Sequence, residues 1–137
     1  MCAKKKHARH NIVFRNDSHL PDGVELRTIY ALLDWPKLKS NIEVLPVSRY
    51  PGYKSADIEM NGLPWEIKNP KGNGKYVVSR NMKTASKQSE NIILDMRRMG
   101  GSYKEYLPEI KREFTANPRL RRMLIITKAQ TIIDMSD

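Results

Sequence analysis

The sequence predicts a single α+β domain, with a mostly antiparallel β-sheet and helices packed on it. The chain has 137 residues, enough to bury one hydrophobic core but hardly two. Short β-rich runs alternate with amphipathic helical patterns along the whole length. Two turn signals, Asn61-Gly62 and residues 128–130, lie between β-rich runs and predict hairpins. Together these three observations favour helices layered against a sheet built largely from hairpins.

The balance of charged side chains indicates a polyanionic partner. Lys and Arg number 25 against 15 Asp and Glu, which gives a net charge of +10 and a pI near 9.8. Such an excess on a small domain is typical of proteins that contact nucleic-acid phosphates. The alternatives are an acidic protein partner or no charged partner. An anionic membrane is disfavoured, because no basic helical segment carries a clean apolar face of Trp, Phe and Leu.

The cysteine count and the hydropathy pattern exclude several further classes of protein. The chain has one cysteine, Cys2, which excludes an internal disulfide and a Cys-rich metal site. No apolar run approaches the ~20 residues that cross a bilayer. No apolar segment follows the basic start to make a secretory signal. We therefore expect a protein that acts in the cytosol, including the cytosol of a target cell if it is delivered there, and that does not bind a membrane.

The first part of the chain divides at about residue 20. Residues 1–20 mix basic residues and Asn without periodicity, and we expect a loose basic arm attached to a domain of residues 21–137. The arm carries three histidines that we expect to be surface residues: His7, His10 and His19. Apolar residues then recur at helical spacing, which predicts a helix from about 22 to 34, before Pro36.

The rest of the domain alternates between strands and helices. The expected elements are a strand in 42–47, a hairpin over 56–67, a helix in 78–91, a strand in 92–96, a helix through 106–114 and a hairpin around 128–130. Ser79 is a plausible N-cap of the second helix. Tyr106, Ile110 and Phe114 lie four apart and give the third helix one apolar stripe.

The register of the hairpin around Asn61-Gly62 follows from its turn. Both positions of a type I′ turn need positive φ, which Asn and Gly accept. A two-residue loop pairs the flanking residues so that one face is apolar throughout: Met60 with Leu63, Ile58 with Trp65, and Ala56 with Ile67. The opposite face then carries Asp57 facing Glu66, with Lys68 two residues further along.

The pairing of Asp57 with Glu66 needs an explanation, because like charges opposed in a sheet are destabilising. In one interpretation the two acids ligate Mg²⁺ and Lys68 stabilises charge at an attacked phosphate. In a second no metal is needed, and one carboxylate of raised pKa is the general base for a ribose 2′-OH. In a third the face is solvated and Lys68 pairs with Glu66. Glu25, on the first helix, is a candidate third acid or an ordinary surface charge.

The segment after the hairpin is a candidate phosphate-binding shell. Its glycines, Gly72 and Gly74, free the backbone just before a helix N-terminus. The candidate RNA-binding residues lie in this loop and on the next helix: Lys71, Lys75, Arg80, Lys87 and Gln88. The loop does not match a P-loop or a dinucleotide fingerprint. A flexible connector and an ordinary surface helix are the alternatives.

Two stretches carry a resemblance to a known family: "SADIEMNGLPWEIKNPKGNGK" and "SRNMKTASKQSENIILDM". Over about residues 55–96 they resemble the C-terminal tRNase toxin domains of contact-dependent growth-inhibition (CdiA-type) and related polymorphic toxin effectors. The resemblance implies a compact endoribonuclease that cleaves tRNA in a competitor's cytoplasm and is blocked by a cognate immunity protein. Several such toxins have a barnase/EndoU/colicin/RelE-type fold and need no metal.

The same residues also resemble the PD-(D/E)xK nuclease core. That resemblance implies metal-ligating roles for Asp57 and Glu66, a catalytic Lys68 and an accessory Gln88, with Mg²⁺ as the ion and DNA or RNA as substrate. The chain has Ala56 where that core often has Pro. Cofactor use therefore stays open between no metal and Mg²⁺. A non-catalytic nucleic-acid-binding module remains the alternative from another class.

Overall fold

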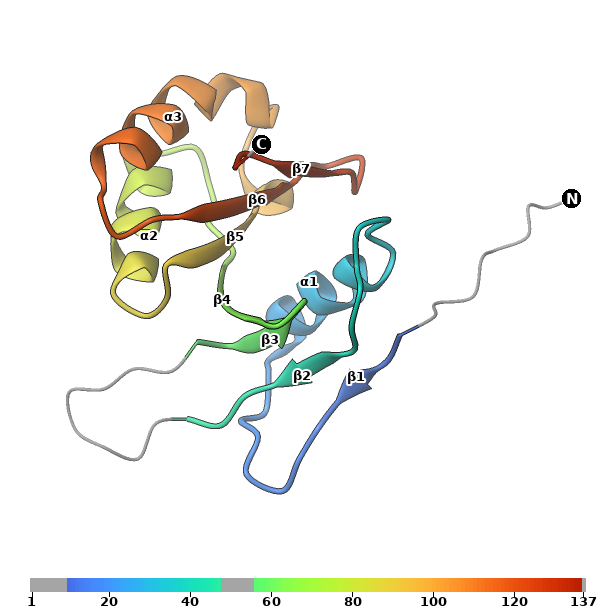
Figure 1. Ribbon diagram of the computed structural model, residues 1–137. Coiled ribbons are helices and arrows are strands. Elements are labelled where there is room, and N and C mark those ends of the chain that lie inside the picture. Colours follow the sequence, from blue (N-terminus) through green and yellow to red (C-terminus); the bar gives the residue numbers. More distant parts are fainter. Residues whose placement is uncertain (1–9, 48–55, 137) are drawn as a thin grey trace, which may run out of the picture.

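The computed structural model describes residues 10–47 and 56–136, which form one seven-stranded sheet with helices on both faces (Figure 1). The strands, which lie in the sheet in chain order, are β1 (Ile12–Val13), β2 (Ile42–Val44), β3 (Ile58–Met60), β4 (Leu63–Lys68), β5 (Asn91–Asp95), β6 (Arg122–Ile126) and β7 (Ile132–Asp134). The helices are α1 (Gly23–Leu33), α2 (Val77–Ser86) and α3 (Leu107–Ala116), with short 3₁₀ turns η1 (Met96–Arg98) and η2 (Tyr103–Tyr106). No described helix is long and apolar enough to span a membrane.

The α+β class is confirmed, but the sheet is not mostly antiparallel. Strands β2–β3, β3–β4 and β6–β7 pair antiparallel, whereas β1–β2, β4–β5 and β5–β6 pair parallel. The prediction was wrong on this point because α2 and α3 connect successive strands of the sheet. A helical crossover returns the chain to the same end of the sheet, so the strands that it joins run parallel.

The hydrophobic core lies in two layers, one on each face of the sheet. Side chains of β5 and β6 alternate between them. Ile93 of β5 packs into the layer under α1, and its neighbours Ile92 and Leu94 pack into the layer under α2 and α3. Figure 1 shows β4 in the middle, with β1–β3 and α1 on one side and β5–β7 with α2 and α3 on the other.

Helix α1 and the closing hairpin are confirmed close to their predicted positions. The Asp22 side chain caps α1 by accepting a 2.8 Å hydrogen bond from the Glu25 N–H. Helix α2 differs at both ends from the prediction. It begins after Tyr76, whose φ is 66°, so Ser79 lies inside the first turn and is not the N-cap; its N–H donates to Glu109 at 2.7 Å. Gln88 lies beyond the end of the helix.

The segment before α1 is more ordered than expected. Ile12 and Val13 form β1 and pair with β2, and Ser18 bridges to Pro46. The His19 N–H donates to the Leu45 carbonyl at 3.1 Å. Ile12, Val13, Ser18 and His19 are therefore tied to the β2 segment, because it supplies backbone partners that the local sequence does not indicate. His7 and the rest of residues 1–9 lie outside the described residues.

The predicted hairpin register is confirmed. Asn61 and Gly62 both have positive φ, 53° and 77°. The β3–β4 ladder has the predicted pairs Ile58–Trp65 and Met60–Leu63, with Glu59 opposite Pro64 between them. The ladder stops at Ile58, so neither Asp57 and Glu66 nor Ala56 and Ile67 form a ladder pair. The Asp57 carboxylate takes the Ile67 N–H instead, at 2.8 Å.

Candidate active site

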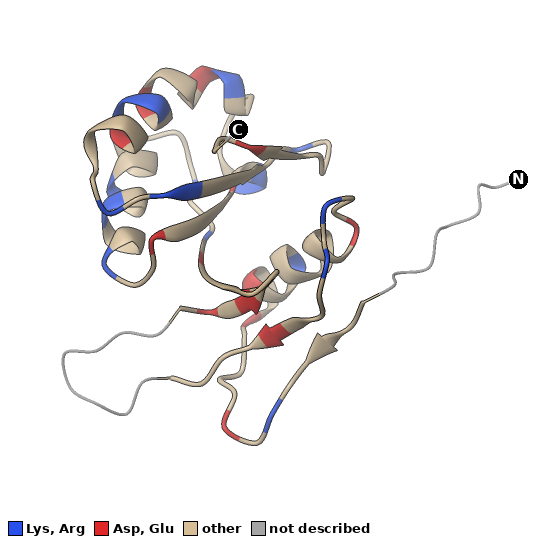
Figure 2. Ribbon diagram, viewed as in Figure 1, with Lys and Arg blue, Asp and Glu red and all other residues tan. Residues whose placement is uncertain are grey.

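A pocket of about 330 Å³ lies where the N-terminus of α1, the start of β3 and the end of β4 meet. It is lined by Asp22, Val24, Glu25, Asp57, Glu66, Ile67, Lys68, Asn69 and Arg98. Figure 2 shows acidic segments on β2, β3 and the start of α1, basic ones along α2 and β6, and both kinds on α3. The pocket thus gathers carboxylates inside a protein of strongly positive net charge.

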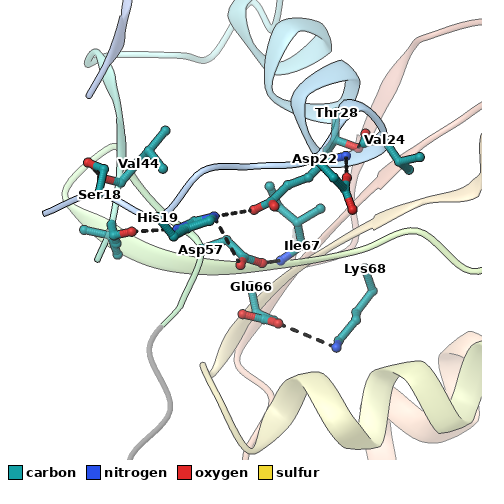
Figure 3. Close-up of polar contacts among 12 residues, drawn as sticks. Ser18, His19, Asp22, Val24, Thr28, Val44, Asp57, Glu66, Ile67 and Lys68 are labelled. Atoms are coloured by element: carbon teal, nitrogen blue, oxygen red, sulfur yellow. Dashed lines mark hydrogen bonds and ion pairs between the residues drawn. The ribbon is translucent and has the colours of Figure 1, made fainter. Parts of the chain in front are cut away.

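One edge of β4 has no neighbouring strand over its last residues, and Asp57 lies at this edge. The N-terminal half of β4 pairs with β3, while residues 66–68 pair with β5 on the other side. Because β3 begins only at Ile58, the edge of β4 beyond Trp65 has no strand beside it in the described residues. Asp57 fills that place by accepting from the Ile67 N–H, which holds its carboxylate next to Glu66 (Figure 3).

Glu66 is the most unusual group of the pocket. It is 4% exposed, and its Oε1 is buried without a hydrogen-bond partner among the described residues. Its Oε2 lies 3.6 Å from the Lys68 Nζ. Burial and the nearby Asp57 charge raise the pKa of Glu66 to about 8, against the opposing effect of Lys68. A buried carboxylate with an unsatisfied oxygen is costly unless a proton or a cation occupies that side.

His19 was missed as a site residue, and it lies in the same cluster. Its Nδ1 is 2.6 Å from the Leu45 carbonyl, which can only accept, so Nδ1 carries a proton. Its Nε2 lies 3.0 Å from the Glu25 Oε2 and 4.0 Å from the Asp57 Oδ1 (Figure 3). In neutral His19 the Nε2 lone pair would face these oxygens, so a proton or a cation must lie between them.

The pKa shifts of His19 and Glu25 agree with that geometry. Burial, followed by the charge of Asp57, raises the pKa of Glu25. For His19 burial is the largest effect and lowers the pKa, but the hydrogen bonds to Leu45 and Glu25 outweigh it, and the net pKa is raised. Both groups therefore hold a proton more tightly than usual, as expected where the negative charges of neighbouring carboxylates are not balanced by a cation.

The residues present fit a divalent cation. One ligand atom each from His19, Glu25 and Asp57 lie within 4.8 Å of one another, and the orphan Oε1 of Glu66 belongs to the same pocket. The Leu45 carbonyl holds the His19 ring in the tautomer that leaves Nε2 free, the usual arrangement of a metal-binding histidine. An imidazole nitrogen in the donor set favours Mn²⁺ or Zn²⁺ over Mg²⁺, which prefers oxygen ligands.

The structure brings the predicted Asp57, Glu66 and Lys68 together with Glu25, the candidate third acid, and adds His19. None of the five predicted RNA-binding residues lines this pocket: Lys71, Lys75, Arg80, Lys87 and Gln88. The Lys75 Nζ lies 5.4 Å from the centre of the Tyr76 ring. Arg98, which follows β5 and which sequence analysis did not select, does line the pocket. No sequence periodicity marks it or His19.

Comparisons with known proteins place the chain in a family. A model described as the contact-dependent growth inhibition CdiA C-terminal domain matches residues 54–132, which include Asp57, Glu66 and Lys68. A chain from the "CdiA-CT/CdiI toxin and immunity complex from Burkholderia pseudomallei" has a similar fold, with a TM-score of 0.58 and 16% identity over 93% of this chain and 99% of that one. No curated protein sequence matches. Because the model covers more than half of the 137 residues, the chain belongs to the CdiA C-terminal domain family of contact-dependent growth inhibition.

Proposed function

We propose that the protein is a toxic nuclease that hydrolyses phosphodiester bonds with the help of a divalent cation, and that its substrate is RNA, tRNA above all. The observation that carries the proposal is the buried Glu66 oxygen without a partner, in one pocket with Asp57, Glu25 and Lys68. Membership in the CdiA C-terminal domain family supports a toxin role. The net charge of +10 supports a polyanionic substrate.

The side chains of the pocket divide the chemical work. His19, Glu25, Asp57 and Glu66 would hold the ion, which would act as a Lewis acid at the phosphate and lower the pKa of an attacking water. Lys68, 3.6 Å from Glu66 and about a fifth exposed, carries a positive charge at the pocket wall. There it can stabilise the negative charge that grows on the phosphate oxygens in the transition state.

We further propose that the protein acts in the cytosol of a target cell and that a cognate immunity protein binds it. The similar fold in a toxin and immunity complex supports the partner. The charge of this chain supports an acidic surface on that partner, since a basic protein is bound fastest by a complementary one. Co-purification of the chain with the product of a neighbouring gene tests this point.

The function is tested by incubating the protein with total tRNA and with duplex DNA, each with Mn²⁺, with Mg²⁺ and with EDTA. We expect tRNA cleavage with Mn²⁺ and none with EDTA. The Glu66→Gln variant should be inactive, whereas Glu59→Gln, on the exposed face of the same hairpin, should cleave like wild type. Cleavage of neither substrate under any condition would contradict the nuclease and leave a nucleic-acid-binding module.

A metal-free ribonuclease is the second candidate, and the pKa of Glu66 favours it. With a pKa of about 8 the Glu66 carboxyl is protonated at neutral pH when no cation is present, and Asp57 beside it would then be the general base for a ribose 2′-OH. Cleavage of tRNA that survives EDTA, together with products ending in a 2′,3′-cyclic phosphate, would establish this chemistry over the metal-assisted one.

A further inference from the structure

A second, smaller cavity of about 140 Å³ adjoins the candidate active site. It is lined by Val24, Arg27, Asn69, Asp95, Arg97 and Arg98. Three of these residues, Val24, Asn69 and Arg98, also line the first pocket, so the two spaces are neighbours. The first pocket is rich in carboxylates, whereas the second has three arginines and one acid.

That one acid, Asp95, is already satisfied by other groups. Its Oδ2 accepts from the Arg97 Nη2 at 2.7 Å and from the Thr28 hydroxyl at 2.6 Å. Its Oδ1 accepts from the Arg97 Nε at 2.9 Å and from the Arg97 N–H at 3.2 Å. Asn69 donates to the Thr28 hydroxyl at 2.7 Å and fixes it in turn. Asp95 and Arg97 therefore neutralise each other and form a rigid wall of the cavity.

The other two arginines are not neutralised. Within residues 10–47 and 56–136, neither Arg27 nor Arg98 forms an ion pair, and both are exposed. Arg27 projects from α1, and Arg98 ends the η1 turn after β5. The Gly72 N–H donates to the Arg98 carbonyl at 3.2 Å, which ties the Lys71-Gly72 loop to the turn that carries Arg98. The cavity thus presents two guanidinium groups that have no ion-pair partner in the described part of the chain.

We propose that this cavity is a phosphate subsite, which binds a backbone phosphate next to the phosphate at the active site. Guanidinium groups suit this role because their forked N–H donors match phosphate oxygens. The carboxylates next door would repel a phosphate that had no cation, so the arginine cavity is the part of this surface that attracts the polyanion by itself. The inference rests on the proposed nuclease function, and it makes an internal stretch of chain, with phosphates on either side of the cut, the preferred substrate.

The test uses two double variants that remove the same charge. Arg27→Ala with Arg98→Ala removes both unpaired arginine side chains from the proposed subsite. Arg112→Ala with Arg119→Ala removes two exposed arginines on and after α3 that line neither pocket. Binding of total tRNA is measured by fluorescence anisotropy in EDTA at several salt concentrations. We expect the subsite variant to lose roughly tenfold in affinity and the slope of log K against log salt to fall by about two, and we expect the control to change less than about twofold.

Cleavage of total tRNA with Mn²⁺ supplies the second readout. The subsite variant should have a KM roughly tenfold higher and a kcat that is lowered much less. The reason is that Arg27 and Arg98 of the wild type would bind the substrate equally well in the ground state and in the transition state. Equal losses in the two double variants, or no tRNA binding by the wild type, would overturn the subsite. Wild-type protein that binds tRNA with the expected difference between variants but cleaves nothing would leave the subsite standing and defeat the nuclease function.

Discussion

Two neighbouring strands of the sheet end in the same kind of charged pair, and the two pairs behave differently. Strand β4 ends with Glu66 and, two residues on, Lys68; strand β5 ends with Asp95 and, two residues on, Arg97. Both acids are almost fully buried, at 4% and 2% exposure. Both pairs stand at the carboxyl ends of parallel strands, where sheets of this kind place their ligands.

The difference lies in how many donors reach each carboxylate. Asp95 accepts hydrogen bonds on both oxygens, including a bidentate fork from the Arg97 side chain. Glu66 has only the Lys68 ammonium at 3.6 Å and leaves Oε1 without a partner in the described part of the chain. Arginine can saturate a neighbouring acid, whereas lysine supplies a single point charge. Saturation makes Asp95 structural, and its lack leaves Glu66 available for a ligand.

The largest expected effect is on catalysis. Glu66→Gln should lower the rate of tRNA cleavage by ~10³-fold, since it removes both a ligand charge and the proton-binding group. The rate is measured with Mn²⁺ at saturating tRNA. Because Gln has the same shape as Glu, we expect the variant to fold normally, and circular dichroism checks this.

Glu59→Gln is the matched control for that variant. Glu59 belongs to the same hairpin, is exposed, and pairs in register with Pro64. Its replacement should leave both the rate and the stability within the ±0.5 kcal/mol typical of surface changes. If Glu66→Gln retained wild-type cleavage beside this control, Glu66 would be as structural as Asp95.

The second effect concerns stability, and here the change at Asp95 should have the larger effect and the change at Glu66 the smaller one. Asp95→Asn should lower the free energy of unfolding by about 3 kcal/mol, because it leaves the Arg97 guanidinium without its buried partner. Glu66→Gln in the same urea titration should be neutral or stabilising, since it removes a buried carboxylate with an unsatisfied oxygen. Similar losses in both variants would end the distinction between the two pairs.

The sequence predicted the local part of this arrangement well. The Asn61-Gly62 turn determines which residues of the hairpin share a face, so the grouping of Asp57, Glu66 and Lys68 follows from the residues alone. The toxin family was also predicted, from the residues of that hairpin and the segments after it, and the family model confirms it. Alternation of side chains carries this information over short distances.

Other features depend on contacts that no local pattern encodes. His19 enters the site because β2 supplies the Leu45 carbonyl to both its backbone and its ring. Arg98 lines both cavities because β5 is placed beside β4 by a helical crossover. The parallel pairings were missed for the same reason. The roles of Asp57, Glu66, Lys68 and the basic shell in catalysis and binding remain predictions.

A third test separates the two pairs by their response to a cation. Mn²⁺ at roughly 30-fold above its dissociation constant should raise the free energy of unfolding by about 2 kcal/mol. His19→Ala and Asp57→Asn should each lose most of this gain, because each removes a ligand atom of the cluster. Asp95→Asn, although less stable, should gain as much as the wild type. A gain that survives loss of His19 and of Asp57 would place the ion elsewhere.

The last test is the pH dependence of stability, measured in EDTA so that no cation binds. Folded Glu66 keeps its proton up to a pKa of about 8, whereas the unfolded chain releases it near the ordinary value of 4.5. Between these values the folded state binds more protons, so stability falls as pH rises, by at most about 1.4 kcal/mol per pH unit for one proton. The contribution is fully present below pH 4.5 and is lost above pH 8.

Glu25 and His19 also have raised pKa values and add slopes of the same sign, so the wild-type curve alone does not identify Glu66. The difference between wild type and Glu66→Gln does, since the variant has no proton to release at that position. We expect the wild type to lose more stability than Glu66→Gln between pH 5 and pH 8. If stability fell equally with pH in the wild type and in Glu66→Gln, the pKa of Glu66 would not be raised. Its buried oxygen would then be hydrogen-bonded in solution, as the oxygens of Asp95 are to Arg97.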